Sequence, residues 1–338
     1  MHWIRNLKPK QWELNVNVEE VVRVNDLRTH FFIEEGIVKA VDGVSLRIHR
    51  GECLGLVGES GCGKSMTALS ILRLIPEPPG KIVSGQIYFK GGDLMQLTEK
   101  GMREIRGKEI SMIFQEPSAS MNPSFCIGNQ IREIIWFHQG GGKKAIAEKS
   151  IESLKTVQIP DVQRILLQYP HELSGGMIQR VMIAMAIACE PDLLICDEPT
   201  TALDISTQAQ IIALLNNLRE ERGTSMLFIT HDLGILSWIC TSVAVMYAGN
   251  VIEYSDIRSI LRNPLHPYTQ ALIESTPRLD TNNPNKLKVI PGQVPNLIHA
   301  PAGCKFNPRC QLAMESCREA PPPMREREEG HWVACFLS

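Results

Sequence analysis

Gly58-Glu59-Ser60-Gly61-Cys62-Gly63-Lys64-Ser65 follows the apolar run Cys53-Leu54-Gly55-Leu56-Val57 and opens a helix-like segment, residues 65–74. The apolar run is typical of a buried parallel strand. Glycines let the backbone turn so that successive N–H groups face phosphate oxygens, and the helix start adds positive charge. We expect Lys64 to reach the β- and γ-phosphates of a nucleotide and the Ser65 hydroxyl to bind Mg²⁺. This order of strand, loop and helix predicts a P-loop fold of the α/β class.

A second strand-like run, Leu193-Leu194-Ile195-Cys196, ends at Asp197 and Glu198. Asp197 is placed to hold Mg²⁺ through water, and Glu198 to polarise an attacking water as general base. An acidic pair after an apolar run is more often a strand end that meets solvent. Its position after the phosphate loop favours the catalytic interpretation.

The segment Leu173-Ser174-Gly175-Gly176-Met177-Ile178-Gln179-Arg180 predicts a helix start. Ser174 is a good N-cap, and Gly175 and Gly176 leave the first N–H groups of the helix uncovered. Such a helix start binds an anion well. The simpler alternative is an ordinary capped helix.

This segment resembles the signature motif of the ATP-binding cassette (ABC) ATPases, which P-loop enzymes of other families lack. The resemblance covers about residues 18–338. It implies that Ser174, Gly175 and Gly176 meet the γ-phosphate bound by a second subunit. It also implies that the chain's own ATP is contacted by the loop and the helix start that follows it: Gly58, Glu59, Ser60, Gly61, Cys62, Gly63, Lys64, Ser65 and Met66.

Further landmarks of the family occur in order. Gln115 resembles the Q-loop glutamine that senses Mg²⁺ and the attacking water, and Asp204 ends a D-loop-like Thr201-Ala202-Leu203-Asp204. His231 resembles the switch histidine that contacts the γ-phosphate. Phe31 is our choice for the aromatic residue that stacks on adenine, with Phe32 as the alternative, although both could be core residues.

The pattern of runs and breakers predicts four parts. Residues 1–17 form a loosely held arm, residues 18–115 and 191–255 an ABC-type core, residues 116–190 a helical subdomain, and residues 256–338 a small extension with four cysteines. The expected strands are 20–24, 38–48, 53–57, 87–89 (at an edge), 110–114, 193–196, 226–230, and a hairpin of 243–247 and 251–254 around Ala248-Gly249-Asn250. The expected helices are 65–74, 127–137, 145–157, 175–188, 205–222, 233–240 and 268–275.

Composition sets limits on the function. The chain has 338 residues, 43% of them apolar and 21% charged, as in a globular protein of two or three units. The net charge of −2 gives no basic bias, so nucleic acid is not expected as a partner. No apolar stretch approaches the ~20 residues that cross a bilayer. With no signal-peptide pattern either, we expect a cytosolic protein with reduced cysteines.

Two sequence segments of the C-terminal extension suggest a substrate class. Asn263-Pro264-Leu265-His266-Pro267-Tyr268-Thr269-Gln270-Ala271-Leu272 and Ile290-Pro291-Gly292-Gln293-Val294-Pro295 resemble the extension of ATPases from dipeptide, oligopeptide and nickel importers. The alternative is a proline-punctuated linker with one short helix.

The resemblance implies a peripheral subunit at the cytoplasmic side of the cell membrane. Its partners would be a second homologous ATPase, two permeases and a substrate-binding protein acting through them. Nickel or oligosaccharide uptake is the close alternative to peptide uptake. A soluble ABC ATPase of repair or translation is disfavoured because no coiled-coil insertion or second cassette is present. Intact Glu198 and His231 disfavour a non-catalytic subunit.

Four of the ten cysteines, Cys304, Cys310, Cys317 and Cys335, fall in the extension with the spacing C-x5-C-x6-C-x17-C. We expect them to ligate one metal centre, because a small loop-rich segment commonly needs a staple. The spacing lacks the close C-x2-C pairs of common zinc sites, yet four thiolates suit either zinc or a [4Fe–4S] cluster. The resemblance favours iron–sulfur, since some peptide-importer ATPases carry such a cluster there. Free thiols are the third alternative.

Overall fold

The computed structural model describes residues 19–201, 203–275 and 290–338. The predicted arm at residues 1–17 and Ala202 of the D-loop-like segment lie outside the described residues. The chain divides into two compact units: unit 1 comprises residues 1–96 and 228–338, and unit 2 comprises residues 97–227. The four-part division expected from the sequence stays a prediction.

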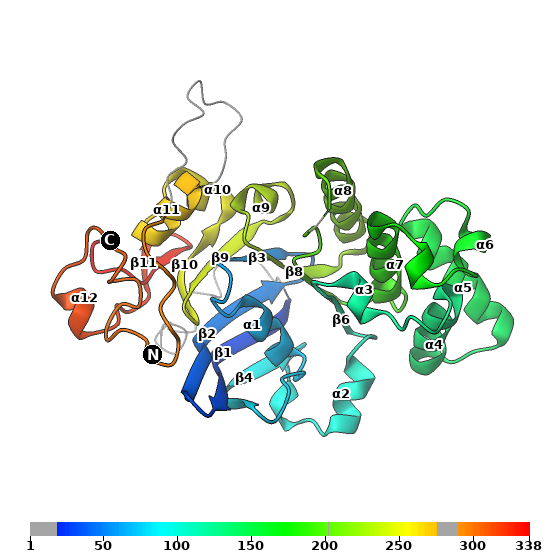
Figure 1. The fold of residues 1–338 in the computed structure, drawn as a ribbon, viewed down its shortest axis with the longest axis horizontal. Coiled ribbons are helices and arrows are strands. Elements are labelled where there is room, and N and C mark those ends of the chain that lie inside the picture. Colours follow the sequence, from blue (N-terminus) through cyan, green and yellow to red (C-terminus); the bar gives the residue numbers. More distant parts are fainter. Residues whose placement is uncertain (1–18, 202, 276–289) are drawn as a thin grey trace. The chain divides into compact units, whose positions relative to one another are not determined.

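An antiparallel sheet forms the first part of unit 1, with strand order β2-β1-β4-β5; Figure 1 shows its long strands β2, β1 and β4. Its strands are β1 (Glu20–Ile33), β2 (Gly36–His49), β4 (Gly80–Phe89) and the two-residue β5 (Gly92–Asp93). Apolar residues of β1 such as Val22, Val24 and Leu27 are buried, as a half-covered strand requires. The prediction of an edge strand at residues 87–89 is wrong, because β4 lies between β1 and β5.

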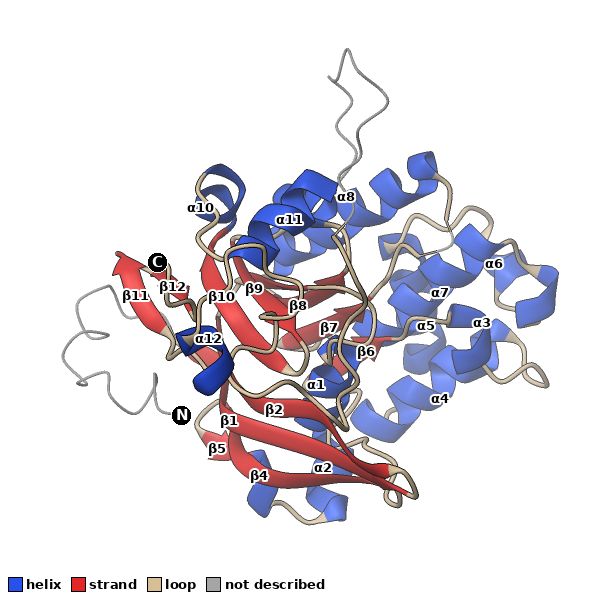
Figure 2. Ribbon diagram, turned by 60° about the vertical axis from the view of Figure 1, so that its left-hand side comes forward, coloured by secondary structure: helices blue, strands red, loops and turns tan. Residues whose placement is uncertain are grey.

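The other strands of unit 1 are ordered β11-β12-β10-β9-β3; Figure 2 shows β11, β12, β10 and β9. They are β3 (Cys53–Val57), β9 (Ser242–Tyr247), β10 (Asn250–Asp256), β11 (Arg325–Glu328) and β12 (His331–Val333). β3 and β9 are parallel, and β9 and β10 form the predicted hairpin. Its turn is shorter than expected: Ala248 and Gly249 have positive φ values of 46° and 84°, which suits a two-residue type I′ turn, and Asn250 belongs to the strand.

Short helices complete unit 1. They are α1 (Lys64–Ile71), the 3₁₀ turn η2 (Leu94–Gln96), α9 (Leu233–Ile239), α10 (Ile257–Arg262), α11 (Pro267–Ser275) and α12 (Ser316–Glu319). The helix predicted at 65–74 ends early, because Arg73 adopts a positive φ of 51° just before Pro76. In the extension the sequence predicted only the helix now seen as α11. It missed β11 because all four of its residues are charged and exposed.

Unit 2 is mainly helical (Figure 1). It contains α2 (Glu99–Ile105), α3 (Pro117–Ser120), α4 (Ile127–Gln139), α5 (Lys143–Thr156), α6 (Val162–Ile165), the 3₁₀ turn η3 (Pro170–Glu172), α7 (Gly175–Ile187) and α8 (Ile205–Arg222). The parallel strands β6 (Ile110–Ile113) and β7 (Leu193–Asp197) pair with each other, and β8 (Ser225–Thr230) crosses the division between the units. The mixture of parallel strands and helices confirms the predicted α/β class.

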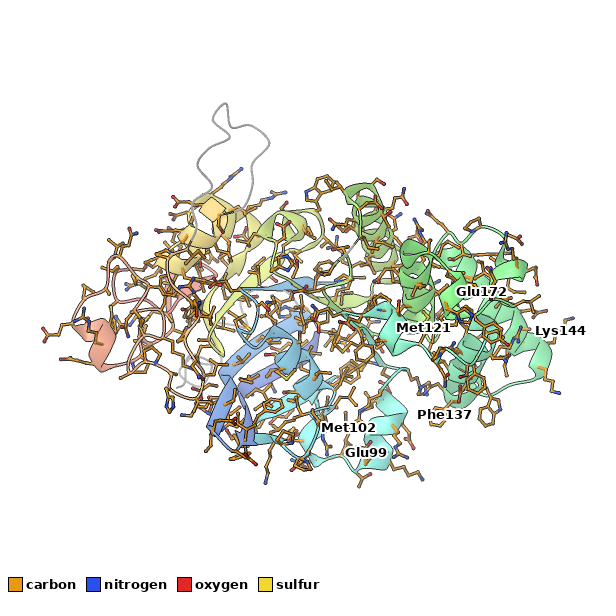
Figure 3. The ribbon with its side chains drawn as sticks, viewed as in Figure 1. Glu99, Met102, Met121, Phe137, Lys144 and Glu172 are labelled. Carbon is orange, nitrogen blue, oxygen red and sulfur yellow. The ribbon has the colours of Figure 1, made fainter. Side chains whose placement is uncertain are left out.

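Helices α3, α4 and α5 pack against α7. Ile131, Leu154 and Val181, one from each of α4, α5 and α7, are fully buried between them. Phe137 and Lys144 lie instead at the exposed edge of this group (Figure 3). In the described parts of the chain, none of the helices combines the length and apolar character of a membrane span.

The extension is attached to β10 by the buried carboxyl group of Glu253. Its Oε1 accepts hydrogen bonds from the Leu265 N–H (2.7 Å) and from His331 Nε2 (2.8 Å), and its Oε2 accepts one from the His266 N–H (3.0 Å). β12 pairs with β10 beside these bonds. His266 itself is buried, and its Nδ1 accepts a hydrogen bond from the Tyr268 N–H (3.0 Å).

Stability of this junction should fall with acidity. Burial lowers the pKa of His266 to about 4, against the opposing effect of the Glu253 carboxylate. The unfolded chain takes up a proton near the ordinary pKa of about 6.5, so between these values the unfolded state binds more protons. Between pH 7 and pH 5 this should remove about 2 kcal/mol of stability.

Thermal melting at the two pH values checks this, with His266→Asn as the matched variant that cannot titrate. The wild type should lose more stability than the variant on going to pH 5. Equal losses in the two proteins would contradict the assignment.

Candidate nucleotide-binding site

The loop of residues 58–63 can be built only with glycine at two points. A Cβ atom on Gly58 would lie 2.2 Å from the carbonyl oxygen of Met246, and one on Gly63 would lie 2.2 Å from that of Ala40. Gly61 and Gly63 also have positive φ values of 77° and 106°. At Gly58 and Gly63 the loop backbone therefore packs directly against two carbonyl oxygens, and the loop turns tightly into the start of α1.

Lys64 is buried at the start of α1. Its Nζ donates hydrogen bonds to the carbonyl oxygens of Gly58 (2.8 Å) and Glu59 (3.1 Å), so the ammonium closes over its own loop. An anion in the loop would compete for the same ammonium group. The Thr67 hydroxyl donates to the carbonyl oxygen of Gly63 (2.9 Å) and fastens the helix start on which Ser65 and Met66 lie.

Cys62 has a structural part in the loop. Its side chain is fully buried, and burial raises the pKa of its thiol. Its carbonyl oxygen accepts a hydrogen bond from the N–H of Gly249 (2.9 Å), which ties the loop to the turn between β9 and β10. The thiol is therefore neutral and packs as a small apolar group.

Two residues of the extension hold Glu59, and sequence reasoning did not find them. Arg309 pairs with both carboxylate oxygens of Glu59, and the Glu59 N–H donates a hydrogen bond to the Tyr268 hydroxyl (2.8 Å). Tyr268 lies in the segment of residues 263–272 that resembles the importer extension, so the sequence did contain a signal for it. No sequence signal pointed to Arg309, apart from its position directly before Cys310.

His231 and Phe31 are the other predicted site residues of unit 1. His231 is exposed between β8 and α9, and Asp232 caps α9 by accepting a hydrogen bond from the Gly234 N–H (2.7 Å). Phe31 is half-buried in β1, whereas Phe32 is 49% exposed. Greater exposure favours Phe32 as a stacking surface, and the choice between the two stays a prediction.

In unit 2, Gln115 and Glu198 are brought together. Glu198 follows the fully buried strand β7, with a positive φ of 46°. Its Oε2 accepts hydrogen bonds from the Thr201 hydroxyl (2.8 Å) and from Gln115 Nε2 (3.3 Å). Asp197, one residue earlier, is 4% exposed. The predicted general base thus has an oriented carboxylate beside the predicted Q-loop glutamine.

The predicted signature segment lies at the surface of unit 2. Ser174 is the N-cap residue of α7, as expected, and its carbonyl oxygen accepts the Ile178 N–H (2.9 Å). The expectation that its side chain caps the helix is wrong, because the hydroxyl makes no capping hydrogen bond. A Cβ on Gly175 would meet nothing within 4 Å, and on Gly176 only the Thr207 methyl group at 3.1 Å. The helix start is thus open at Gly175.

Asp204 caps α8 and is fixed by its neighbours. Its carboxylate accepts hydrogen bonds from the Thr207 hydroxyl (2.7 Å), the Thr207 N–H (2.9 Å) and the Ser206 hydroxyl (2.7 Å). These bonds, led by that from the Thr207 side chain, hold the pKa of Asp204 well below its ordinary value. The next residue, Ile205, is 86% exposed, which is unusual for a large apolar side chain.

The four cysteines of the extension line one small cavity with a volume of about 10 Å³, roughly that of a single water probe. Burial raises the pKa of the Cys304 thiol to about 11 and raises that of Cys310. In residues 19–201, 203–275 and 290–338, no group of three or more His, Cys, Asp or Glu side chains is arranged to hold a metal ion. The four thiols therefore line one cavity, but their side chains are not arranged as the ligands of a metal ion.

Two family models match the chain. Residues 41–201 match the ABC transporter family, and residues 252–317 match the oligopeptide/dipeptide transporter C-terminal region. A probable peptide ABC transporter ATP-binding protein of Sinorhizobium fredii is 48% identical over 96% of this chain and 97% of its own length. The oligopeptide transport ATP-binding protein AppD of Bacillus subtilis is 46% identical over 94% of this chain and 96% of its own.

Solved structures agree with these relatives. The dimeric bacterial ABC transporter cassette MJ0796 has a TM-score of 0.64 at 27% identity, covering 70% of this chain and 99% of that one. Its post-hydrolysis structure with ADP and Pi has a TM-score of 0.64 at 28% identity, covering the same shares of both chains. These likenesses confirm the predicted ABC-type fold. The chain belongs to the ABC transporter family, as an ATP-binding subunit and ATPase that carries the oligopeptide/dipeptide transporter C-terminal region.

Proposed function

We propose that this ATPase powers the import of dipeptides or oligopeptides, as a peripheral subunit at the cytoplasmic side of the cell membrane. The observation that carries the proposal is the match of residues 252–317 to the oligopeptide/dipeptide transporter C-terminal region. In the structure this region is attached to the phosphate loop itself, through Arg309 and Tyr268 on Glu59. The extension is therefore built into the nucleotide-binding unit.

The predicted motif residues serve ATP binding and hydrolysis in this proposal, and the order of the motifs along the chain supports it. The N–H groups of the loop and the Lys64 ammonium hold the phosphates. Glu198 accepts a proton from the attacking water, and Gln115 and Thr201 keep its carboxylate oriented. His231 contacts the γ-phosphate, and Phe31 stacks on adenine, with the more exposed Phe32 as the alternative.

Oxygen donors suited to Mg²⁺ are present in the same motifs. They are the Ser65 hydroxyl, the Asp197 carboxylate and the side-chain amide oxygen of Gln115. The amide nitrogen of the same side chain, Nε2, donates the hydrogen bond to Glu198. When bound, Mg²⁺ neutralises charge on the β- and γ-phosphates.

A second, homologous ATPase completes the site in this proposal. Ser174 and Gly175 lie exposed at the start of α7, where the hydroxyl is not used for capping. Asp204 and the exposed Ile205 provide a further surface for the partner. The two subunits close head to tail on two ATP molecules, and hydrolysis and phosphate release reopen them.

Two permease subunits are the proposed membrane partners, and a substrate-binding protein acts through them. An exposed apolar surface of unit 2 supports this. Phe125 is 51% exposed and Leu167 is 75% exposed. Their segments lie side by side, because the Ile127 and Gly128 N–H groups donate hydrogen bonds to the carbonyl oxygens of Gln168 and Leu166 (2.8 and 2.9 Å). Large exposed apolar side chains on neighbouring segments are a feature of protein docking sites.

Cys304, Cys310, Cys317 and Cys335 are proposed to ligate one metal centre, a [4Fe–4S] cluster in the first place and zinc as the alternative. Their common cavity supports one centre, and the donor set suits both metals. To bind such a centre, the thiols would have to lose their protons. The centre would staple the loops of the extension.

The substrate class can be tested on the complex assembled with its partner ATPase, permeases and binding protein in lipid vesicles. Short peptides should stimulate its ATP hydrolysis, because the loaded binding protein favours the closed ATPase pair. Nickel ions and an oligosaccharide are tested in parallel as the alternative substrates. Stimulation by either of these, with none by peptides, would replace the proposed substrate.

Glu198→Gln should hydrolyse ATP about 10²–10⁴-fold more slowly. The glutamine side chain has nearly the same shape as glutamate, but it cannot accept the proton of the attacking water. ATP binding should remain, so ATP should trap closed dimers with the partner ATPase, visible by size-exclusion chromatography. Glu220→Gln, an exposed change on α8, is the control and should hydrolyse ATP at the wild-type rate.

Ser174→Arg added to Glu198→Gln should abolish the trapped dimer, since the larger cation blocks the surface that meets the partner's ATP. The isolated double variant should still bind ATP, unlike Lys64→Ala. Loss of ATP binding by the isolated Ser174→Arg chain would contradict a role in the partner's site. Hydrolysis by Glu198→Gln near the wild-type rate would contradict the general base.

Anaerobic purification followed by metal analysis and visible absorption tests the cysteine centre. We expect iron and inorganic sulfide together with visible absorption, both lost on Cys317→Ser. Stoichiometric zinc in a colourless protein would contradict the cluster, and the absence of any metal would contradict the site. Free thiols would then be the correct description.

A further inference from the structure

The C-terminal extension holds the second residue of the phosphate loop. Arg309 Nη1 lies 2.7 Å from Glu59 Oε2, and Arg309 Nη2 lies 3.0 Å from Glu59 Oε1. The two bonds form a parallel, two-pronged pair, the strongest geometry for a guanidinium and a carboxylate. The pair joins two parts of unit 1 that are distant in sequence, so it fixes one to the other.

Arg309 is itself held rigidly. Its side chain is 4% exposed. Its Nε donates to the carbonyl oxygen of Pro291 (2.8 Å), and its Nη1 also reaches the Tyr247 hydroxyl (3.3 Å). The guanidinium lies 5.8 Å from the ring centre of Tyr247 and 5.9 Å from that of Phe306. A buried arginine with all of these hydrogen bonds has little conformational freedom. Its two bonds to the Glu59 carboxylate therefore fix the position of that side chain.

Tyr268 holds the backbone of the same residue. Its hydroxyl accepts the hydrogen bond from the Glu59 N–H, and its ring is fully buried. The ring packs edge-on against Tyr247 and Phe306, with centroids 4.7 and 5.4 Å away. Both the side chain and the N–H of Glu59 are therefore bonded to the extension, which leaves the N–H groups further along the loop for phosphate.

We propose that Arg309 and Tyr268 are positioning residues for ATP: through Glu59 they hold the phosphate loop in its binding conformation. The inference rests on the proposed role of residues 58–65 as the ATP site. Neither residue is placed to touch the reacting atoms, so they act on nucleotide affinity. Loss of Arg309 leaves a largely buried carboxylate without its charge partner. Because the Glu59 side chain is only 27% exposed, hydration of that carboxylate then favours movement of the loop toward water.

Four variants of the full chain test the inference: Arg309→Met, Glu59→Gln, the two combined, and Tyr268→Phe. Titration with a fluorescent ATP analogue gives the dissociation constant, and thermal melting shows that each variant is folded. The single variants should bind about 2- to 30-fold more weakly, the range for residues that change affinity without touching the ligand. Because Glu59→Gln removes the unpaired charge, the combined variant should bind no worse than Arg309→Met alone.

In the assembled complex, Arg309→Met should raise the KM for ATP by a similar factor and leave kcat within about twofold, since only binding is affected. Arg47→Met is the matched control, because Arg47 pairs with Glu20 at 2.8 Å in the antiparallel sheet of the same unit. It should keep the wild-type KM for ATP.

Wild-type affinity in Glu59→Gln and Tyr268→Phe would overturn the inference, even if Arg309→Met fails to fold. Additive losses in the combined variant, or an equal rise in KM for Arg47→Met, would also overturn it. Failure of the wild-type chain to bind ATP would instead contradict the proposed function, so the two results are distinguishable.

Discussion

The close approach of the phosphate loop to two backbone carbonyl oxygens is the constraint on which unit 1 depends. Gly58 lies against the carbonyl oxygen of Met246 in β9, and Gly63 lies against that of Ala40 in β2. Because no side chain fits at either point, the loop can turn tightly between β3 and α1 and present its N–H groups. The parallel pairing of β3 with β9 sets one of these contacts, and β2 sets the other. The antiparallel sheet and the parallel strands therefore meet at the nucleotide loop.

Most of this core was predictable from the sequence because its signals are local. Five consecutive buried residues give β3, and the limits of α8 follow from the Asp204 cap and from Gly223, whose positive φ of 66° ends the helix. Glu198 was identified from its place after a buried strand. Its hydrogen bond from Gln115 then shows two predicted residues in contact, which strengthens both assignments without testing the chemistry.

Contacts that join distant parts of the chain could not be read in this way. The Arg309–Glu59 pair depends on how the extension folds back, and no spacing or period encodes that. β11 was missed because its stability comes from pairing with β12 and not from burial of its own residues. The unused hydroxyl of Ser174 shows the opposite error: the residue type predicted a local cap, whereas the open helix start fits a role toward a partner.

Hydrogen–deuterium exchange of the full chain, measured with and without ATP and Mg²⁺, tests the central claim most directly. The claim is that residues 58–66 bind the nucleotide while the extension holds them. Exchange of the amides in residues 58–66 should slow when ATP binds, and exchange in residues 290–310 should slow with it, because Arg309 links the two segments. Unchanged exchange in residues 58–66 would contradict the nucleotide site, and slowing there without any change in residues 290–310 would contradict the link.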